Sequence, residues 1–160
     1  MTFEKHQYAL LISSVFTYIT QIMEKNIRIL FVDDDADDRM LFMEAVKEVD
    51  ENYECVTAND GRQALDLLNN DVHSLPDIIF LDINMPRLSG KKCLSEIKNN
   101  ERLKHIPVII YTTSKDVEES KELKEMGAYH FISKPSNAED IYFLISIALE
   151  EHLHFAGRNK

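Results

Sequence analysis

Polar residues suited to phosphoryl transfer follow four short apolar stretches of the sequence. In chain order they are Asp33 and Asp34 after the run 27–32, Asp82 after 78–81, Thr112 after 108–111 and Lys134 after 131–133. Such runs are typical of buried strands, and the carboxyl ends of neighbouring parallel strands border one crevice. The pattern therefore predicts carboxylates, a hydroxyl and an ammonium in one site.

Carboxylates held close together repel one another, and one of them protonates unless a cation neutralises the group. Oxygen ligands favour a hard cation, and Mg²⁺ typically takes one or two carboxylates and keeps waters that a phosphate can displace. We expect Asp33 and Asp34 to hold Mg²⁺ together with Asp82 and the backbone carbonyl of Asn84. Helix capping is the alternative role for aspartates at 33–35, but it does not account for Thr112 and Lys134.

An aspartate can also attack phosphorus and form an acyl phosphate. Asp82 is the best candidate for this nucleophile, because it ends the run 78–81, the third predicted strand, and precedes a loop, residues 83–86, that must turn sharply. In this scheme Lys134 pairs with one phosphoryl oxygen and the Thr112 hydroxyl binds another.

From residue 26 onward, predicted strands and helices alternate with short connections. The expected strands are 27–32, 53–58, 78–81, 108–111 and 131–133, and the expected helices begin near residues 36, 60, 90, 116 and 136. This alternation predicts βαβ units and an α/β fold with a parallel sheet. The third and fourth strands are almost wholly apolar, as expected when helices cover both faces of the sheet.

Local signals place several helix ends. Two segments match the capping-box pattern, Asp60-x-x-Gln63 and Ser136-x-x-Glu139, and Gly127 is suited to a left-handed helix end. The helix at 116–126 carries only three apolar residues among many charged ones, which predicts a lightly packed, solvated element.

The overall charge is acidic, with 18 Lys and Arg against 28 Asp and Glu and a formal net charge of −10. This balance argues against non-specific nucleic-acid binding, which needs a basic surface. Cys55 and Cys93 are far apart and belong to no Cys-x-x-Cys motif, so we expect two reduced core thiols and a cytoplasmic protein.

Residues 1–25 do not fit the alternating pattern. The stretch 7–23 has no acidic or basic residue, but it is too short and too rich in hydroxyls for a membrane span, and no signal-peptide cleavage site follows it. Two interpretations remain: an added helix that packs on the domain or a partner, or codons upstream of a true start at Met23. We expect the main domain at 26–154 and a short tail at 155–160.

The chain resembles the receiver domain of two-component response regulators, the family that includes the chemotaxis regulators. The matching segments are Val32-Asp33-Asp34-Asp35, Leu81-Asp82-Ile83-Asn84-Met85-Pro86 with Gly90, Pro107-Val108-Ile109-Ile110-Tyr111-Thr112, and Gly127-Ala128 before Lys134-Pro135. More loosely, Pro86-Arg87, Ile97-Lys98, Leu103, Ile106-Pro107 and Thr112-Thr113-Ser114 resemble stand-alone regulators associated with phytochrome kinases.

The resemblance implies a flavodoxin-like, doubly wound five-stranded sheet of order 2-1-3-4-5. It also implies that Asp82 accepts phosphate from a kinase phosphohistidine, with Asp33 and Asp34 serving Mg²⁺. A cis bond between Lys134 and Pro135 is expected from the family. Phe131 stands at the position of an aromatic switch residue that turns inward when Thr112 moves toward the phosphate. Since it lacks a tyrosine hydroxyl, no switch step through such a hydroxyl is expected.

These observations predict a single-domain response regulator that is phosphorylated by a histidine kinase or phosphotransfer protein and signals through protein contacts. It would catalyse only its own phosphorylation and dephosphorylation, and it would have no DNA-binding domain on this chain. A receiver-like binding module that is never phosphorylated is the alternative. A haloacid dehalogenase-type phosphohydrolase is disfavoured, because it needs a second aspartate where Asn84 stands. A homodimer through the last helix is a further hypothesis, opposed by the acidic residues there.

Overall fold

The computed structural model describes residues 26–70 and 74–156. In chain order the elements are β1 (Arg28–Val32), α2 (Ala36–Val49), β2 (Glu54–Ala58), α3 (Gly61–Asn70), β3 (Ile78–Leu81), α4 (Gly90–Asn99), β4 (Val108–Thr112), α5 (Val117–Glu125), β5 (His130–Ser133) and α6 (Ala138–Ala156). The predicted N-terminal extension, residues 1–25, lies outside the described residues, as does most of the tail.

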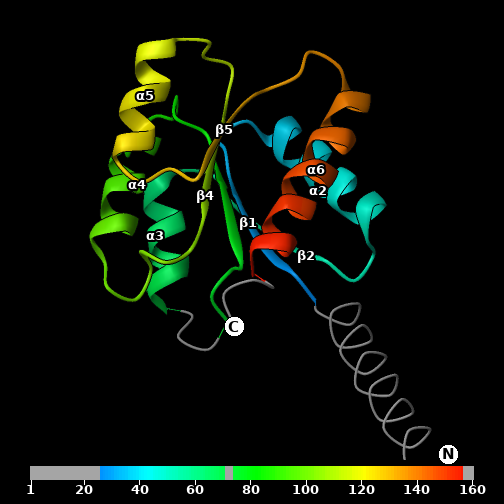
Figure 1. The fold of residues 1–160 in the computed structure, drawn as a ribbon, viewed down its shortest axis with the longest axis horizontal. Helices are drawn as coiled ribbons and strands as arrows, with labels where there is room; N and C mark the ends of the chain where they lie inside the picture. Colours follow the sequence, from blue (N-terminus) through cyan, green and yellow to red (C-terminus); the bar gives the residue numbers. More distant parts are fainter. Residues whose placement is uncertain (1–25, 71–73, 157–160) are drawn as a thin grey trace, which may run out of the picture.

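All neighbouring strands pair in parallel, in the order β2-β1-β3-β4-β5. In Figure 1, α2 and α6 cover one face of this sheet, and α3, α4 and α5 cover the other. The predicted α/β fold and strand order are therefore confirmed. The chain steps outward from β1 in one direction and from β3 in the other, so a crevice opens at the carboxyl ends of these two central strands.

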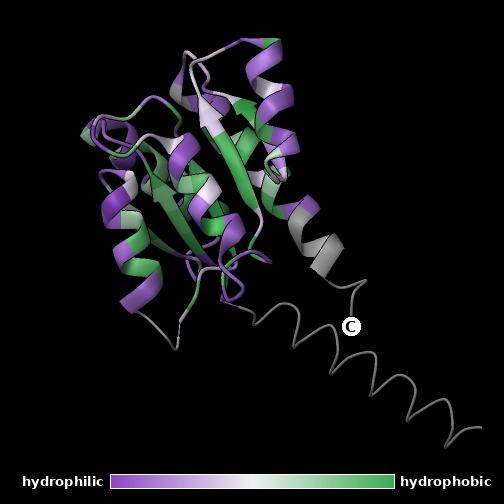
Figure 2. Cartoon of the chain, turned by 90° about the vertical axis from the view of Figure 1, so that its left-hand side faces the viewer, coloured by the Kyte–Doolittle hydropathy of each residue, from purple (hydrophilic) through white to green (hydrophobic). Residues whose placement is uncertain are grey.

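Each face of the sheet has its own apolar core, because successive strand residues face opposite sides. Leu30 and Ile79 belong to the core beneath the helices α3, α4 and α5. Ile29 and Phe31 belong to the core beneath α2 and α6. In Figure 2 the strands inside the molecule are largely hydrophobic, whereas the helices around them mix hydrophilic and hydrophobic residues.

An aromatic cluster fixes α2 against the sheet. The Phe42 ring stacks on Phe31 with 3.9 Å between centroids, and Phe80 and Tyr111 meet it edge-on. The residues that precede the site are therefore held in a close-packed interior.

Helix ends follow the sequence signals with one exception. Asp60 caps α3 as predicted, and Gly127 has φ +100° after α5. The predicted cap Ser136 is wrong: the Asn137 side chain accepts from the Asp140 amide at 2.9 Å, and its own amide donates to the Asp140 carboxylate. Asparagine is as good a cap as serine, and the cap lies one residue later than expected.

Both cysteines are free thiols, and burial raises the pKa of Cys55 and Cys93 to about 12. Neither thiol is therefore activated as a nucleophile. No helix in residues 26–70 and 74–156 has the length and apolar character that crossing a bilayer requires.

Candidate functional site

The strand ladder continues just past the strand ends and fixes the first residues of the site. The Asp33 amide donates to Ala58 O at 3.0 Å, and the Asp82 amide donates to Val32 O at 2.9 Å. At the other side of the crevice, the Lys134 amide donates to Thr112 O at 2.8 Å. These backbone bonds hold the predicted site residues at one edge of the sheet.

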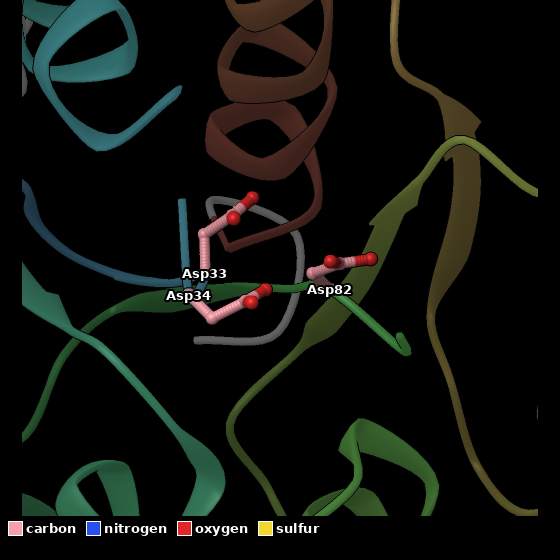
Figure 3. A group of neighbouring side chains, drawn as sticks. All are labelled: Asp33, Asp34 and Asp82. Atoms are coloured by element: carbon pink, nitrogen blue, oxygen red, sulfur yellow. The ribbon is translucent and has the colours of Figure 1, made fainter. Parts of the chain in front are cut away.

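Three carboxylates meet there, at the ends of β1 and β3 (Figure 3). Asp33, Asp34 and Asp82 each place one oxygen within 4.8 Å of the others. Asp33 is completely buried and Asp82 is 5% exposed, whereas Asp34 faces solvent. The structure thus brings together the three acidic residues that the sequence pattern singled out.

Asp33 is the most constrained of the three. Its Oδ1 accepts from the Asp35 amide at 2.9 Å, while its Oδ2 is buried without a hydrogen bond of good geometry and lies 2.6 Å from the Lys134 ammonium. Burial raises the pKa of the Asp33 carboxyl, and the Lys134 ammonium and the Asp35 amide offset this only in part. A buried oxygen with unused lone pairs, beside two more carboxylates, fits a hard divalent cation.

The Lys134 side chain crosses the site from the end of β5 and is 10% exposed. Its ammonium lies 2.6 Å from Asp33, 2.8 Å from Asp38 and 3.6 Å from Asp82. Burial opposes its charge, but the surrounding carboxylates outweigh burial and raise the pKa of Lys134. The expected cis bond to Pro135 is wrong, since the described residues contain no cis peptide. The ammonium reaches the carboxylates from a trans bond, the form that X–Pro bonds usually prefer.

Thr112 and Asn84 form the remaining side of the site. Thr112 is fully buried, and its Oγ1 accepts from Asn84 Nδ2 at 3.3 Å and from the Ser114 amide at 3.4 Å. The Asn84 amide donates to Asp82 Oδ1 at 3.3 Å. Phe131 lies half-buried on β5, packed against the core beneath α3, α4 and α5.

Two side-chain pairs at the site were missed by the sequence reasoning. Asp38, on the first turn of α2, bonds the Lys134 ammonium, and Arg87 pairs with Asp60 at 2.8 Å. The sequence shows an acidic first turn and a capping box, but it contains no signal for either long-range partner. Both contacts depend on how separate elements meet in the folded chain.

Comparison with known proteins identifies this arrangement. The sequence profile of the response regulator receiver domain matches residues 29–146. Response regulator Rcp1 of Synechocystis sp. is 31% identical over 121 residues, which cover 73% of this chain and 82% of Rcp1. Regulatory protein AtoC of Escherichia coli is 34% identical over 137 residues, but the match spans only 28% of AtoC.

Solved structures agree with the sequence comparison. The phosphorylated cyanobacterial phytochrome response regulator RcpA superposes with a TM-score of 0.75 at 29% identity, covering 81% of this chain and 95% of RcpA. The Mn²⁺-bound form of Rcp1 gives a TM-score of 0.69 at 30% identity, covering 75% and 89% of the two chains. This chain belongs to the response regulator receiver domain family of two-component systems.

Proposed function

We propose that the receiver domain accepts a phosphoryl group on Asp82 from the phosphohistidine of a histidine kinase or phosphotransfer protein. The observation that carries the proposal is the grouping of Asp82 with Asp33, Asp34 and the buried Lys134 ammonium. A carboxylate oxygen of Asp82 attacks phosphorus, the bond from phosphorus to the donor nitrogen breaks, and its electron pair stays on the imidazole. Attack of water on the acyl phosphate later releases phosphate and restores the carboxylate.

Asp33, Asp34 and Asp82 would hold the divalent cation, with the Asn84 carbonyl as a further ligand, and we propose Mg²⁺. When bound, the cation supplies the positive charge that lets the carboxylates and an incoming phosphate share the site. Lys134 would pair with a phosphoryl oxygen, and the Thr112 hydroxyl would donate to another. Because the Thr112 oxygen already accepts two weak hydrogen bonds, at 3.3 and 3.4 Å, its hydrogen is available for this contact.

The proposed output is a change of protein contacts. Movement of Thr112 toward the phosphoryl group would leave room for Phe131 to turn inward, which would alter the surface around β5, α5 and α6. In this proposal the protein acts in the cytoplasm, turns over only its own acyl phosphate, and requires neither nucleic acid nor a membrane.

The test is the intact mass of the protein after incubation with acetyl phosphate and Mg²⁺, beside an Asp82→Asn variant. We expect the wild type alone to gain one phosphate, and a metal chelator to abolish the gain. Asparagine keeps the shape of the residue but removes the nucleophilic carboxylate, together with its charge as a metal ligand. If neither acetyl phosphate nor a panel of phosphorylated histidine kinases modifies the wild type, the proposal is wrong and an unphosphorylated binding module is the better reading.

A further inference from the structure

The Lys134 ammonium has three N–H donors and more carboxylate neighbours than the proposed reaction uses. The ammonium donates a hydrogen bond of good geometry to Asp38 Oδ2 at 2.8 Å. Asp33 makes an ion pair at 2.6 Å, whereas Asp82 stands back at 3.6 Å. The ammonium is therefore held between Asp33 and Asp38, and it lies farther from Asp82, the proposed phosphate acceptor.

Asp38 is well placed to hold it there. The Asp35 side chain caps α2 by accepting from the amides of Asp37 and Asp38, at 2.8 and 3.3 Å, so the first turn is fixed. The aromatic stack of Phe42 on Phe31 secures the next turn against the sheet. The Asp38 carboxylate is 38% exposed, so the structure tolerates its charge without burying it fully.

We infer that Asp38 is a positioning residue for Lys134, which keeps the ammonium off Asp82 until a phosphoryl group arrives. The inference builds on the proposed function. An ammonium paired directly with Asp82 would neutralise a carboxylate that the divalent cation needs, and the two cations would compete. Holding Lys134 on Asp38 leaves the Asp82 carboxylate to the metal, while Asp33 Oδ2 stays 2.6 Å from the ammonium. A phosphoryl group on Asp82 carries more negative charge than the Asp38 carboxylate, and it then draws the ammonium across.

The inference separates two ways in which Asp38 could influence the metal. Its negative charge attracts any cation, whatever Lys134 does. Its hydrogen bond acts only through Lys134. Removing Asp38 with Lys134 present should impose both losses, whereas removing it from a chain that lacks the Lys134 ammonium should impose only the first.

The experiment is a double-mutant cycle on Mn²⁺ affinity, followed through the electron paramagnetic resonance signal of free Mn²⁺. The variants are Asp38→Asn, Lys134→Gln and both together, with Asp37→Asn as a matched control. Asp37 is the adjacent residue with the same charge, is exposed, and has no ion pair in the part of the chain that the structure describes. Circular dichroism melts establish that each variant folds.

We expect Asp38→Asn to lower Mn²⁺ affinity about tenfold in the wild-type background, the usual size of such an effect for a residue that orients a metal site. In the Lys134→Gln background the same change should cost less than about threefold. Asp37→Asn should change affinity less than about twofold in either background, because an exposed charge is screened. If the variants without Lys134 fold poorly, Asp38→Glu provides a second test. This variant keeps the carboxylate, so it should retain most of the Mn²⁺ affinity that Asp38→Asn loses.

Equal losses from Asp38→Asn in both backgrounds would overturn the inference, and so would an equal loss in Asp38→Glu and Asp38→Asn. The acetyl phosphate assay on the wild type keeps the two proposals apart. Coupling between Asp38 and Lys134 without phosphorylation would keep Asp38 as a positioning residue for Lys134 and remove the proposed function. Phosphorylation without coupling would do the reverse.

Discussion

Asp60 joins two loops that both border the site. Its Oδ1 accepts from the Gln63 amide at 2.8 Å as a helix cap, and its Oδ2 accepts from Arg87 at 2.8 Å. Arg87 has φ 66°, the left-handed region that side chains rarely occupy, and it lies in the loop that follows Asp82. The ion pair therefore helps to hold this loop in a conformation that its backbone alone would disfavour.

The charge of Asp60 should make stability depend on pH. The Gln63 amide, followed by the Arg87 guanidinium, lowers the pKa of Asp60 below its ordinary value. The folded state thus favours the ionised form, so the stabilisation is present above the unfolded-chain value of about 3.9 and is lost as pH falls through the lower folded pKa. At pH 7, the free energy of unfolding of Asp60→Asn should be lower than that of the wild type by up to about 1 kcal/mol. The loss is small because asparagine still caps the helix and the Arg87 partner is exposed.

Urea unfolding of both proteins between neutral and acid pH measures this difference. The difference in stability should close as pH falls through the folded pKa of Asp60. The same Asp60→Asn comparison made in an Arg87→Ala background should give a smaller difference at every pH. A difference between wild type and Asp60→Asn that does not change with pH would show that the Asp60 charge contributes nothing.

At the scale of elements, the first residue of α4 is what lets that helix approach the site. A Cβ on Gly90 would lie 2.0 Å from the carbonyl oxygen of Asp82 and 2.8 Å from Ile83 Cα. Both neighbours are backbone, so neither can move without displacing the end of β3. Only glycine allows α4 to begin directly against the strand end that carries Asp82.

Gly90→Ala should therefore lower the free energy of unfolding by at least about 2 kcal/mol, in the range of overpacked cores, although alanine is the better helix former. It should also weaken Mn²⁺ binding, because the Asp82 backbone has to shift. Ser95→Ala, a change within the same helix, should be nearly neutral in both measurements. A Gly90→Ala protein with wild-type stability and metal affinity would contradict the close contact.

The helix α5 should be the least stable of the helices around the sheet. Of its residues only Leu123 is buried, and Val117 is 65% exposed, whereas α4 buries Cys93, Leu94 and Ile97. Native-state hydrogen exchange should show faster exchange in the middle of α5 than in the middle of α4. Equal protection of the two helices would mean that α5 is held by more than its packing.

The elements were predictable where burial alone decides them. Residues 78–81 form β3 with the predicted bounds because all of them are buried, and an apolar run between two layers of helices has few alternatives. The grouping of Asp33, Asp34 and Asp82 followed from the topology, since parallel strands bring their carboxyl ends together.

The side-chain partners within the site were not predictable in the same way. Lys134 and Asp38 are 96 residues apart, and Asp60 and Arg87 are 27 apart. Such pairs depend on the relative placement of whole elements, which no local pattern records. The choice of Asn137 over Ser136 as a cap shows the same limit at short range, because both residue types suit the position and the sequence alone does not choose between them.

At the scale of the whole molecule, the outward surface of α6 combines apolar and acidic residues. Phe143 is 63% exposed and Ile147 is 39% exposed. Exposed acidic residues surround them, namely Glu139, Asp140, Glu150 and Glu151. On α5, Lys121 is already paired with Glu118 at 2.8 Å, so it is not free to neutralise a second acidic surface.

This balance predicts self-association that depends on salt. Two α6 surfaces brought together would repel through their carboxylates while burying the Phe143 rings, and the chain as a whole carries a net charge of −10. Sedimentation velocity should show a monomer at about 0.02 M salt and a larger dimer fraction at about 1 M, where the screening length falls to about 3 Å.

Phe143→Ser should abolish the salt-induced dimer, whereas Met40→Ser, which removes an exposed apolar residue on α2, should not. Because phosphorylation adds negative charge, it should not produce a dimer at low salt through this surface. A dimer that forms at low salt and survives Phe143→Ser would place self-association elsewhere on the molecule.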